Sequence, residues 1–294
     1  MSKLEHKVDF VLFVAVNRAN PNGDPLNGNR PRTDYDGYGE ISDVCIKRKI
    51  RNRMQDMGHS VFVQSADRAD DGKKNLKERA SELNKYKDPV EFAKAACEKW
   101  LDVRAFGQVF AYSGDDKKKS KKEENSEEKE SKGVSIGVRG PVSIHCASSI
   151  TPVEVISMQI TKSVNGEAED KKGSDTMGWK HFVDFGLYEI KGAINVQLAE
   201  KTGFSKEDAA VLKECLRTLF VNDASSARPE GSMEVVKLYW WEHNCKDGQY
   251  SSAVVHRSVR AELKAGIDIA KQASDYSIIC NSLGNLEPEE LAGV

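Results

Sequence analysis

The sequence predicts an α+β fold that is built around one buried sheet, and three observations lead to this prediction. Residues 8–16 are apolar on both faces, which is typical of a central strand in a covered sheet, and the mainly apolar run at 233–241 predicts another well-buried strand. Segments that begin at Ser42 and Ser205 join a helix-capping residue to apolar side chains at helical spacing. Strands and helices therefore share a chain of 294 residues, which is long enough to bury a substantial core.

The N-terminal segment predicts one strand, a long loop and one helix. The strand at 8–16 leads into a polar loop that is far longer than the two to six residues usual between a strand and a helix. A helix of about 43–57 follows, because Ser42 or Asp43 is a good N-cap and Gly58 suits the C′ position.

Three further elements are expected before residue 110. The segment "SVFVQ" at 60–64 predicts a short strand, and a helix is expected within 74–87. A second helix begins firmly at Asp88, since Pro89 takes the first helical position and Glu91 the capping-box position. Its apolar side chains keep helical spacing as far as "DVRAFG".

Residues 115–132 predict a disordered surface loop. Fourteen of these eighteen positions are charged, seven of each sign, so the segment cannot contribute to a core. The lysine cluster at 117–122 is open to an alternative interpretation as an RNA contact. Its acidic neighbours neutralise it, which favours an ordinary solvated loop.

The middle of the chain predicts a hairpin and a further strand. Residues 140–163 contain two alternating, β-branched arms around "SSITP", which is the pattern of a β-hairpin. A strand at 188–199 would place five apolar side chains on one face: Tyr188, Ile190, Ile194, Val196 and Leu198.

The C-terminal third predicts a helix, a strand and a less regular end. "SKED" at 205–208 is a capping box that opens a helix, and 233–241 is a buried strand. Residues 254–272 are ambiguous, with a helix as one interpretation, and "EPEELAGV" predicts a loose acidic tail. The order strand, helix, strands, helix, strand fits a ferredoxin-like core that carries large insertions.

Composition indicates where in the cell the protein is expected, but it does not identify a binding partner. The formal net charge is −2, so a nucleic-acid binder would have to gather its positive charge locally. Six cysteines without a C-x-x-C pair fit reduced thiols better than a disulfide framework or a zinc site. "MSKLEHKVDF" does not resemble a signal peptide, and no apolar run approaches the roughly 20 residues of a membrane span. We expect a soluble, cytoplasmic protein.

Motifs of catalysis are missing, and no cofactor or metal is expected. The sequence has no P-loop, no G-x-S-x-G and no H-E-x-x-H. Asn20, Asn22 and Asp24 have the spacing of a calcium loop, but Pro25 replaces its glycine and Pro31 its glutamate. The alternative is a metal-dependent nuclease that assembles four carboxylates in space: Asp24, Asp34, Asp36 and Asp43. The histidines are widely separated, so a structural histidine is the default interpretation of His145.

A concentration of positive charge is found around the first predicted helix. Five basic residues fall between 47 and 53 without an acid among them. The loop before the helix adds Arg18, Arg30 and Arg32, and a helix N-terminus attracts phosphate. An amphipathic helix with solvated cations remains the alternative, and the asparagines of the loop can simply cap turns.

Several blocks together resemble one known family. They are "NPNGDP…GNRPRTDYDGYGEISDVCIKRKIR", "DVRAFGQVFA", "VRGPVSI…ITPVEVISMQITKS", "GSDTMGWKHFVDFGLYEIKGAINVQLA" and "NDASSARPEGSMEVVKLYWWEHN". Their order along nearly the whole chain resembles the RNA-binding backbone subunit of type I CRISPR effector complexes (Cascade), closest to subtype I-C. The charged loop at 115–132 and the C-terminal tail carry the least resemblance.

The resemblance implies a single hand-shaped domain over 1–294, with a modified RNA-recognition-motif palm. It implies a finger-like insertion at 65–135 and a thumb-like hairpin and loop at 139–181. Copies would stack head-to-tail along a guide RNA, kink it and leave segments free to pair with target DNA. Other Cascade subunits, the guide-processing and large subunits, would be partners, and no membrane is involved. The aromatic motif of ordinary RNA-recognition motifs is absent, so we expect a grip on phosphates rather than base stacking on the sheet.

Carried onto this sequence, the resemblance implies a non-catalytic scaffold and a set of RNA-binding residues. In and before the first helix these are Arg18, Asn20, Arg30, Arg32, Ser42, Lys47, Arg48 and Arg51. Near the thumb they are Lys180 and His181, with Met177 as a wedge, and Arg228 is a further candidate. Relatives in type III complexes cleave RNA with an aspartate, so Asp24 or Asp34 could serve a metal-dependent ribonuclease as the alternative function.

Overall fold

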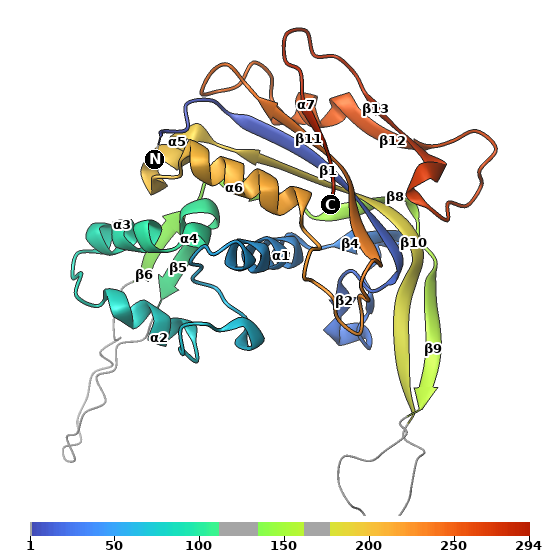
Figure 1. Ribbon diagram of the computed structural model, residues 1–294, viewed down its shortest axis with the longest axis horizontal. Helices are drawn as coiled ribbons and strands as arrows, with labels where there is room; N and C mark the ends of the chain where they lie inside the picture. The colour runs from blue at the N-terminus through green and yellow to red at the C-terminus, as the bar shows by residue number, and fades with distance from the viewer. Residues whose placement is uncertain (1, 112–134, 162–176) are drawn as a thin grey trace, which may run out of the picture.

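The computed structural model describes residues 2–111, 135–161 and 177–294 (Figure 1). Its centre is one antiparallel sheet in the order β14-β11-β1-β10-β8-β4, and β7 and β9 also pair with β10. The strands of this sheet are β1 (Val8–Ala19), β4 (Tyr38–Ile41), β7 (Val142–Ile144), β8 (Ala147–Pro152), β9 (Val155–Thr161), β10 (Met177–Ile194), β11 (Met233–Glu242) and β14 (Glu289–Ala292). The predicted α+β class with a central sheet is therefore confirmed.

Helices and small strand pairs surround this sheet. The helices are α1 (Asp43–Asp56), α2 (Leu76–Ala80), α3 (Pro89–Lys99), α4 (Leu101–Phe106), α5 (Val196–Thr202), α6 (Lys206–Arg217) and α7 (Ser252–Ser258). The small pairs are β2 (Gly23–Asp24) with β3 (Arg30–Pro31), β5 (Gly107–Ala111) with β6 (Ser135–Arg139), and β12 (Val259–Leu263) with β13 (Tyr276–Cys280). None of the described helices combines the length and the apolar character that crossing a bilayer requires.

Strand β1 is covered on both faces, as its sequence predicts. Side chains at alternate positions, among them Phe10 and Leu12, pack with α1, α5 and α6 in the larger core. Val11 and Phe13 point the other way and pack with α7, β12 and β13. Figure 1 shows the same two layers, with α5 and α6 on one side of the sheet and α7 on the other.

The helix starts are also as predicted. Ser42 caps α1 by accepting the N–H of Cys45, and Gly58 beyond the helix has φ 84°. Asp88 caps α3, and Ser205 with Asp208 forms a reciprocal capping box on α6. Local side-chain hydrogen bonds thus fix these helix starts.

The predicted strand at 60–64 is wrong. The backbone N–H groups of Phe62 and Val63 donate to the fully buried carboxylate of Asp102, at 2.6 and 3.1 Å, instead of to another strand. The segment fills the centre of a separate small core with Trp100 and Phe110. Its run of apolar residues reflects burial, of Val61 in the larger core and of Phe62 in this third cluster, which α2, α3, α4 and the β5–β6 pair complete.

The predicted hairpin at 140–163 is wrong in its partners. The predicted turn "SSITP" lies in strand β8, and the predicted arms, which contain β7 and β9, do not pair with each other; β7, β8 and β9 all pair with the long strand β10, and β8 also pairs with β4. The strand predicted at 188–199 ends at Ile194, because Asn195 caps α5 and accepts the N–H of Leu198 at 2.8 Å. Val196 and Leu198 are therefore helical.

The end of the chain is more ordered than expected. Within 254–272 the helix α7 stops at Ser258 and the chain continues as β12. The acidic tail forms β14 and adds an edge strand to β11, where Leu291 packs against the core. Predictions for 115–132 and for the part of the thumb at 162–176 fall outside the described residues.

Candidate nucleic-acid interface

The β1–α1 loop, residues 20–42, is organised by its own polar groups. Strands β2 and β3 form a small pair around a 3-10 turn at Pro25–Asn27, which Asp24 caps by accepting the N–H of Leu26 at 3.3 Å. Asp34 stabilises the next turn by accepting two backbone N–H groups at 2.9 and 2.8 Å. The loop is thus a defined structure that presents its side chains in fixed directions.

Two asparagines hold this loop together. Asn20 is buried and donates from Nδ2 to the carbonyl oxygen of Asn29 at 2.7 Å. The Oδ1 of Asn22 accepts the N–H of Ser42 at 2.9 Å, which fixes the loop to the start of α1. The Asn20 side chain, a predicted RNA contact, therefore lies within the loop and serves its folding.

The three arginines of this region have different surroundings. Arg18 is exposed at φ 49°, pairs with Asp184 at 3.2 Å and lies over the ring of Phe182. Arg32 is partly exposed and pairs with Asp24 at 3.3 Å. Arg30 makes no ion pair among the described residues and donates to the hydroxyl of a residue in β9.

The first turn of α1 carries Ser42, Asp43 and Lys47. Lys47 pairs with Asp43 at 2.9 Å, one helical turn away. This hydrogen bond, more than any other contact, lowers the pKa of Asp43, so a carboxylate occupies the positive end of the helix dipole. A phosphate at this helix N-terminus would have to compete with Asp43 for Lys47.

The other cations of α1 are used inside the protein. Arg48 donates to the carbonyl oxygen of Val63 at 2.7 Å. Arg51 has a side chain only 11% exposed and donates from Nε to Asp102 at 2.8 Å. Both arginines thus attach α1 to the core around Phe62. This structural role could not be predicted from the run of basic residues in the sequence.

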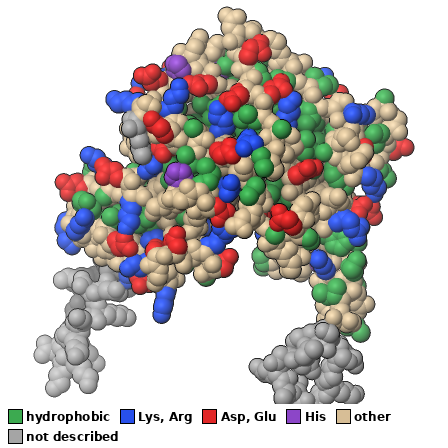
Figure 2. All heavy atoms as spheres, viewed as in Figure 1, with side chains coloured by type: hydrophobic (Ala, Val, Ile, Leu, Met, Phe, Trp, Pro, Cys, Tyr) green, Lys and Arg blue, Asp and Glu red, His purple; other side chains and the backbone are tan. Residues whose placement is uncertain are grey.

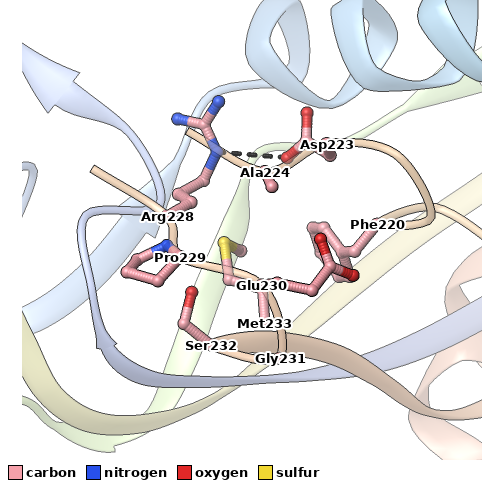
Figure 3. Close-up of a pocket in the computed structure, with 9 residues that line it drawn as sticks. All are labelled: Phe220, Asp223, Ala224, Arg228, Pro229, Glu230, Gly231, Ser232 and Met233. Atoms are coloured by element: carbon pink, nitrogen blue, oxygen red, sulfur yellow. Dashed lines mark hydrogen bonds and ion pairs between the residues drawn. The ribbon is translucent and has the colours of Figure 1, made fainter. Parts of the chain in front are cut away.

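Arg228 belongs to a cluster of charged side chains next to α1, and Figure 3 shows Arg228 with Asp223. Its Nε donates to Asp223 at 3.1 Å, and the buried Lys49 of α1 pairs with the same carboxylate. Burial lowers the pKa of Lys49, although the Asp223 charge opposes this shift. The loop of Arg228 also contacts the β1–α1 loop, since Asn20 N–H donates to Ala227 at 2.9 Å. Two cations thus share the Asp223 carboxylate, and Glu230 adds a second carboxylate to the same loop.

The β9–β10 ribbon, residues 155–161 paired with 177–183, projects from the body (Figure 1). One face carries Met177, Trp179 and His181, and the ring planes of Trp179 and His181 lie within 9° of parallel at a centroid distance of 6.3 Å. The other face carries Lys180 beside Met158 and Ile160. Trp179 is 62% exposed, and in Figure 2 hydrophobic side chains extend along this ribbon.

The carboxylates of the nuclease alternative are engaged elsewhere. Asp24 caps a turn and pairs with Arg32, and Asp34 caps the following turn. Across residues 2–111, 135–161 and 177–294, no three side chains of the metal-binding types are grouped as ligands. The described carboxylates thus stabilise turns of a loop rather than surrounding a common point.

The structure brings some predicted residues together and separates others. Arg30 and His181 meet through the hydroxyl of Ser157, and Arg228 lies against the loop that holds Asn20. Arg48 and Arg51 instead point toward the core around Phe62. Our sequence reasoning missed Ser157, which lies in the predicted hairpin at 140–163, and Trp179, whose strand was predicted to begin only at 188.

Comparisons with known proteins agree with this architecture. Residues 6–281 match the family model described as CRISPR-associated protein Cas7. The CRISPR-associated protein Cas7 of Haloferax volcanii is 27% identical over 218 residues, which cover 71% of this chain and 63% of that protein. The chain thus spans less than two thirds of the length of this relative.

A solved structure shares the fold. The chain of a structure described as "CRISPR RNA-guided surveillance complex, pre-nicking" matches 90% of this chain and 84% of its own length, with a TM-score of 0.51 and 14% identity. The family model extends over all three described parts of the molecule, including the loop and the ribbon. This chain therefore belongs to the CRISPR-associated protein Cas7 family.

Proposed function

We propose that this chain is the guide-RNA-binding backbone subunit of a type I CRISPR surveillance complex, of subtype I-C, and that it works in the cytoplasm. The observation that carries the proposal is the convergence of two exposed structures: the β1–α1 loop, which carries Arg30 and Arg32, and the projecting ribbon. Arg30 joins them directly, because it lies on β3 and donates to the ribbon. Family membership and the sequence blocks quoted above support the same function.

The chemistry favours a grip on phosphates. Arg18, Arg30, Arg32, Lys47 and Lys180 offer donors that phosphate oxygens accept, and such contacts are independent of base sequence. Acidic and basic side chains are interspersed over the face in Figure 2, in keeping with a net charge of −2. RNA would therefore be held by a local track of cations rather than by the field of the whole protein.

The predicted RNA-binding residues divide into two groups. Those with exposed or weakly paired donors are the main candidates: Arg18, Arg30, Arg32, Lys47, Lys180 and His181. Asn20, Ser42, Arg48, Arg51 and Arg228 make hydrogen bonds within the protein, so we propose that they support the surface and bind RNA only where a donor is left over.

The sheet order supports a ferredoxin-like palm of the RNA-recognition-motif kind. Taken in chain order, β1, β8, β10 and β11 are arranged as 4-1-3-2, with α1 and α6 in the same core on one face. In this proposal the region 65–135 is the finger insertion and 139–181 contains the thumb. Met177, exposed near the end of the described ribbon, would be its wedge.

Partners follow from this arrangement. Copies would stack head-to-tail along the guide, through interfaces that do not close on themselves, and the guide would pair with target DNA. The exposed aliphatic side chains Met158 and Ile160 on one ribbon face suit contact with another protein surface, such as a neighbouring copy. The guide-processing and large subunits would complete the complex.

A native gel with a repeat–spacer RNA tests the proposal. Protein titration should give a ladder of discrete, salt-sensitive shifts that lengthens with the RNA, with the RNA intact whether or not Mg²⁺ is present. Arg32→Ala should weaken every step, whereas Arg257→Ala, an exposed arginine on α7 across the sheet, is the matched control.

Two results of this gel would contradict the scaffold. Mg²⁺-dependent shortening of the RNA that Asp24→Asn or Asp34→Asn abolishes would favour the metal-dependent ribonuclease. Absence of any shift with intact, folded protein would remove the RNA-binding function itself.

A further inference from the structure

One hydroxyl group lies between the loop and the ribbon. Ser157 is on β9, directly opposite His181 in the strand register, and its Oγ is 2.9 Å from His181 Nδ1. Arg30, which precedes Ser157 by 127 residues in the chain, donates from Nη1 to the same Oγ at 2.8 Å. Two predicted RNA-binding residues from separate elements therefore share one partner that no motif had indicated.

Hydrogen-bond capacity explains why a hydroxyl suits this position. A serine hydroxyl has one proton and two lone pairs, while a guanidinium can only donate. Arg30 therefore uses one lone pair, and the Ser157 proton is free to bond a neutral His181 at Nδ1. If His181 is protonated, its Nδ1–H can donate to the second lone pair instead. The hydroxyl can therefore keep the link in both protonation states of the histidine, which a methyl group cannot do.

The hydrogen bond from Ser157 to His181 also concerns Trp179, the next residue on the same face of the ribbon. His181 is aligned with Trp179, whose ring is nearly parallel to the imidazole. A two-stranded ribbon on its own is only marginally stable in water, so its orientation depends on such attachments to the body. Strand β3, which carries Arg30, packs beside β10, so the attachment is made at the base of the ribbon.

From this geometry we propose that Ser157 is a positioning residue of the guide-binding surface. Its hydroxyl fixes Arg30 of the loop against His181 of the ribbon, so that both present their donors to the RNA as one preorganised unit. The inference rests on the proposed function, and it adds a residue and a coupling that the family resemblance does not supply. Ser157 acts through its two neighbours.

The position predicts a specific kind of effect. Ser157 is exposed, so removal of its hydrogen bonds should hardly change folding stability. RNA affinity is more sensitive than folding stability to this change. Without the Ser157 hydrogen bonds, the Arg30 side chain and the ribbon must be ordered when the RNA binds. Ser157→Ala should therefore weaken RNA binding roughly three- to tenfold, the equivalent of one hydrogen bond, with an unchanged melting temperature.

A first experiment needs no RNA. Trp100, Trp240 and Trp241 are buried and Trp179 is exposed, so acrylamide quenching reports mainly on Trp179. Ser157→Ala should raise the quenching constant, Ser157→Thr should restore the wild-type value by keeping the hydroxyl, and Ser148→Ala on β8 is the matched control. Equal quenching in wild type and Ser157→Ala would overturn the link, whatever the outcome for RNA.

A double-mutant cycle with guide RNA tests the coupling. If Ser157 acts through Arg30, Ser157→Ala should weaken binding much less in an Arg30→Ala background than in wild type. Fully additive effects, or wild-type affinity of Ser157→Ala, would overturn the positioning role. If wild-type protein binds no RNA at all, the proposed function fails, and the quenching experiment still decides the link between loop and ribbon.

Discussion

Replacement of Asp102 is the sharpest test of how the basic helix is held. This carboxylate is fully buried on α4 and accepts three hydrogen bonds: from the N–H groups of Phe62 and Val63, at 2.6 and 3.1 Å, and from Arg51 Nε at 2.8 Å. Asp102→Ala removes the acceptor of all three hydrogen bonds at once and leaves the donors where water has little access.

The magnitude can be estimated from these hydrogen bonds. A buried donor left without a partner costs about 1–3 kcal/mol, and breaking a buried ion pair costs about 3–5 kcal/mol. These costs overlap, and Arg51 at 11% exposure can turn partly toward solvent, so their sum is an upper limit. We expect a decrease of about 4 kcal/mol in unfolding free energy for Asp102→Ala.

Urea unfolding followed by circular dichroism would measure this decrease. Asp102→Asn, which keeps one oxygen acceptor but removes the charge, should fall between wild type and Asp102→Ala. Glu98→Ala, at an exposed position on the neighbouring α3, should leave the midpoint unchanged. A decrease below about 1 kcal/mol for Asp102→Ala, comparable with an ordinary surface substitution, would refute the attachment of α1 to the core around Phe62 through this carboxylate.

Three further predictions concern the buried Asp9 on β1, the packing of Gly192 on β10 and the N-cap of α6. Burial alone would raise the pKa of Asp9, but hydrogen bonds, led by that from His243, lower it below its usual range. The carboxylate therefore contributes stability above the unfolded-state pKa of about 3.9, which is lost as pH falls through the lower folded-state value. The unfolding free energies of wild type and Asp9→Asn should converge on acidification, and a widening gap would contradict this. Gly192→Ala would place its Cβ 2.2 Å from Phe10 Cζ, so a destabilisation of about 1–3 kcal/mol is expected in thermal melts; an unchanged melt would refute the packing. Ser205→Ala removes the cap of α6 and should cost about 1 kcal/mol by urea titration, whereas Ser205→Asp should retain most of the stability.

Local signals predicted the helices well. Ser42, Asp88 and Ser205 begin helices because their side chains accept a backbone N–H three residues ahead, and this interaction is contained within one turn. The apolar segment that became β1 was also unambiguous, since an uninterrupted run can be buried on both faces. Such features depend only on neighbouring residues.

Strand partners could not be predicted in the same way. The predicted hairpin arms, which contain β7 and β9, have the alternation of a hairpin, yet both pair with β10, which is long enough to accept them one after the other. The segment at Phe62 has the apolar, β-branched composition of a short strand, but Asp102, forty residues away from Phe62 in sequence, accepts its backbone N–H groups. In both cases the backbone hydrogen-bond partner is distant in sequence, so the local pattern could not identify it.

The candidate site likewise contains residues that the local sequence predicts and residues whose role depends on partners distant in the chain. The length and polar composition of the β1–α1 loop indicated a candidate site, and Arg30 and Arg32 do lie on it with exposed or lightly paired groups. The roles of Arg48 and Arg51 were not visible, because they depend on Val63 and Asp102 in the folded protein. Ser157 carries no sequence signal of its own, and only the meeting of β3 with the ribbon reveals it.

The central claim is that the loop and the ribbon grip RNA through its phosphates. The most direct test measures affinity against salt concentration for two single-stranded RNAs of equal length and unrelated sequence. A phosphate grip predicts equal affinities and equal negative slopes of log K against log salt. Joint Arg30→Ala and Arg32→Ala substitution should reduce the steepness by roughly 0.7 for each phosphate that is no longer neutralised. Affinities that differ strongly between the two sequences, or a slope that the double variant leaves unchanged, would contradict the claim.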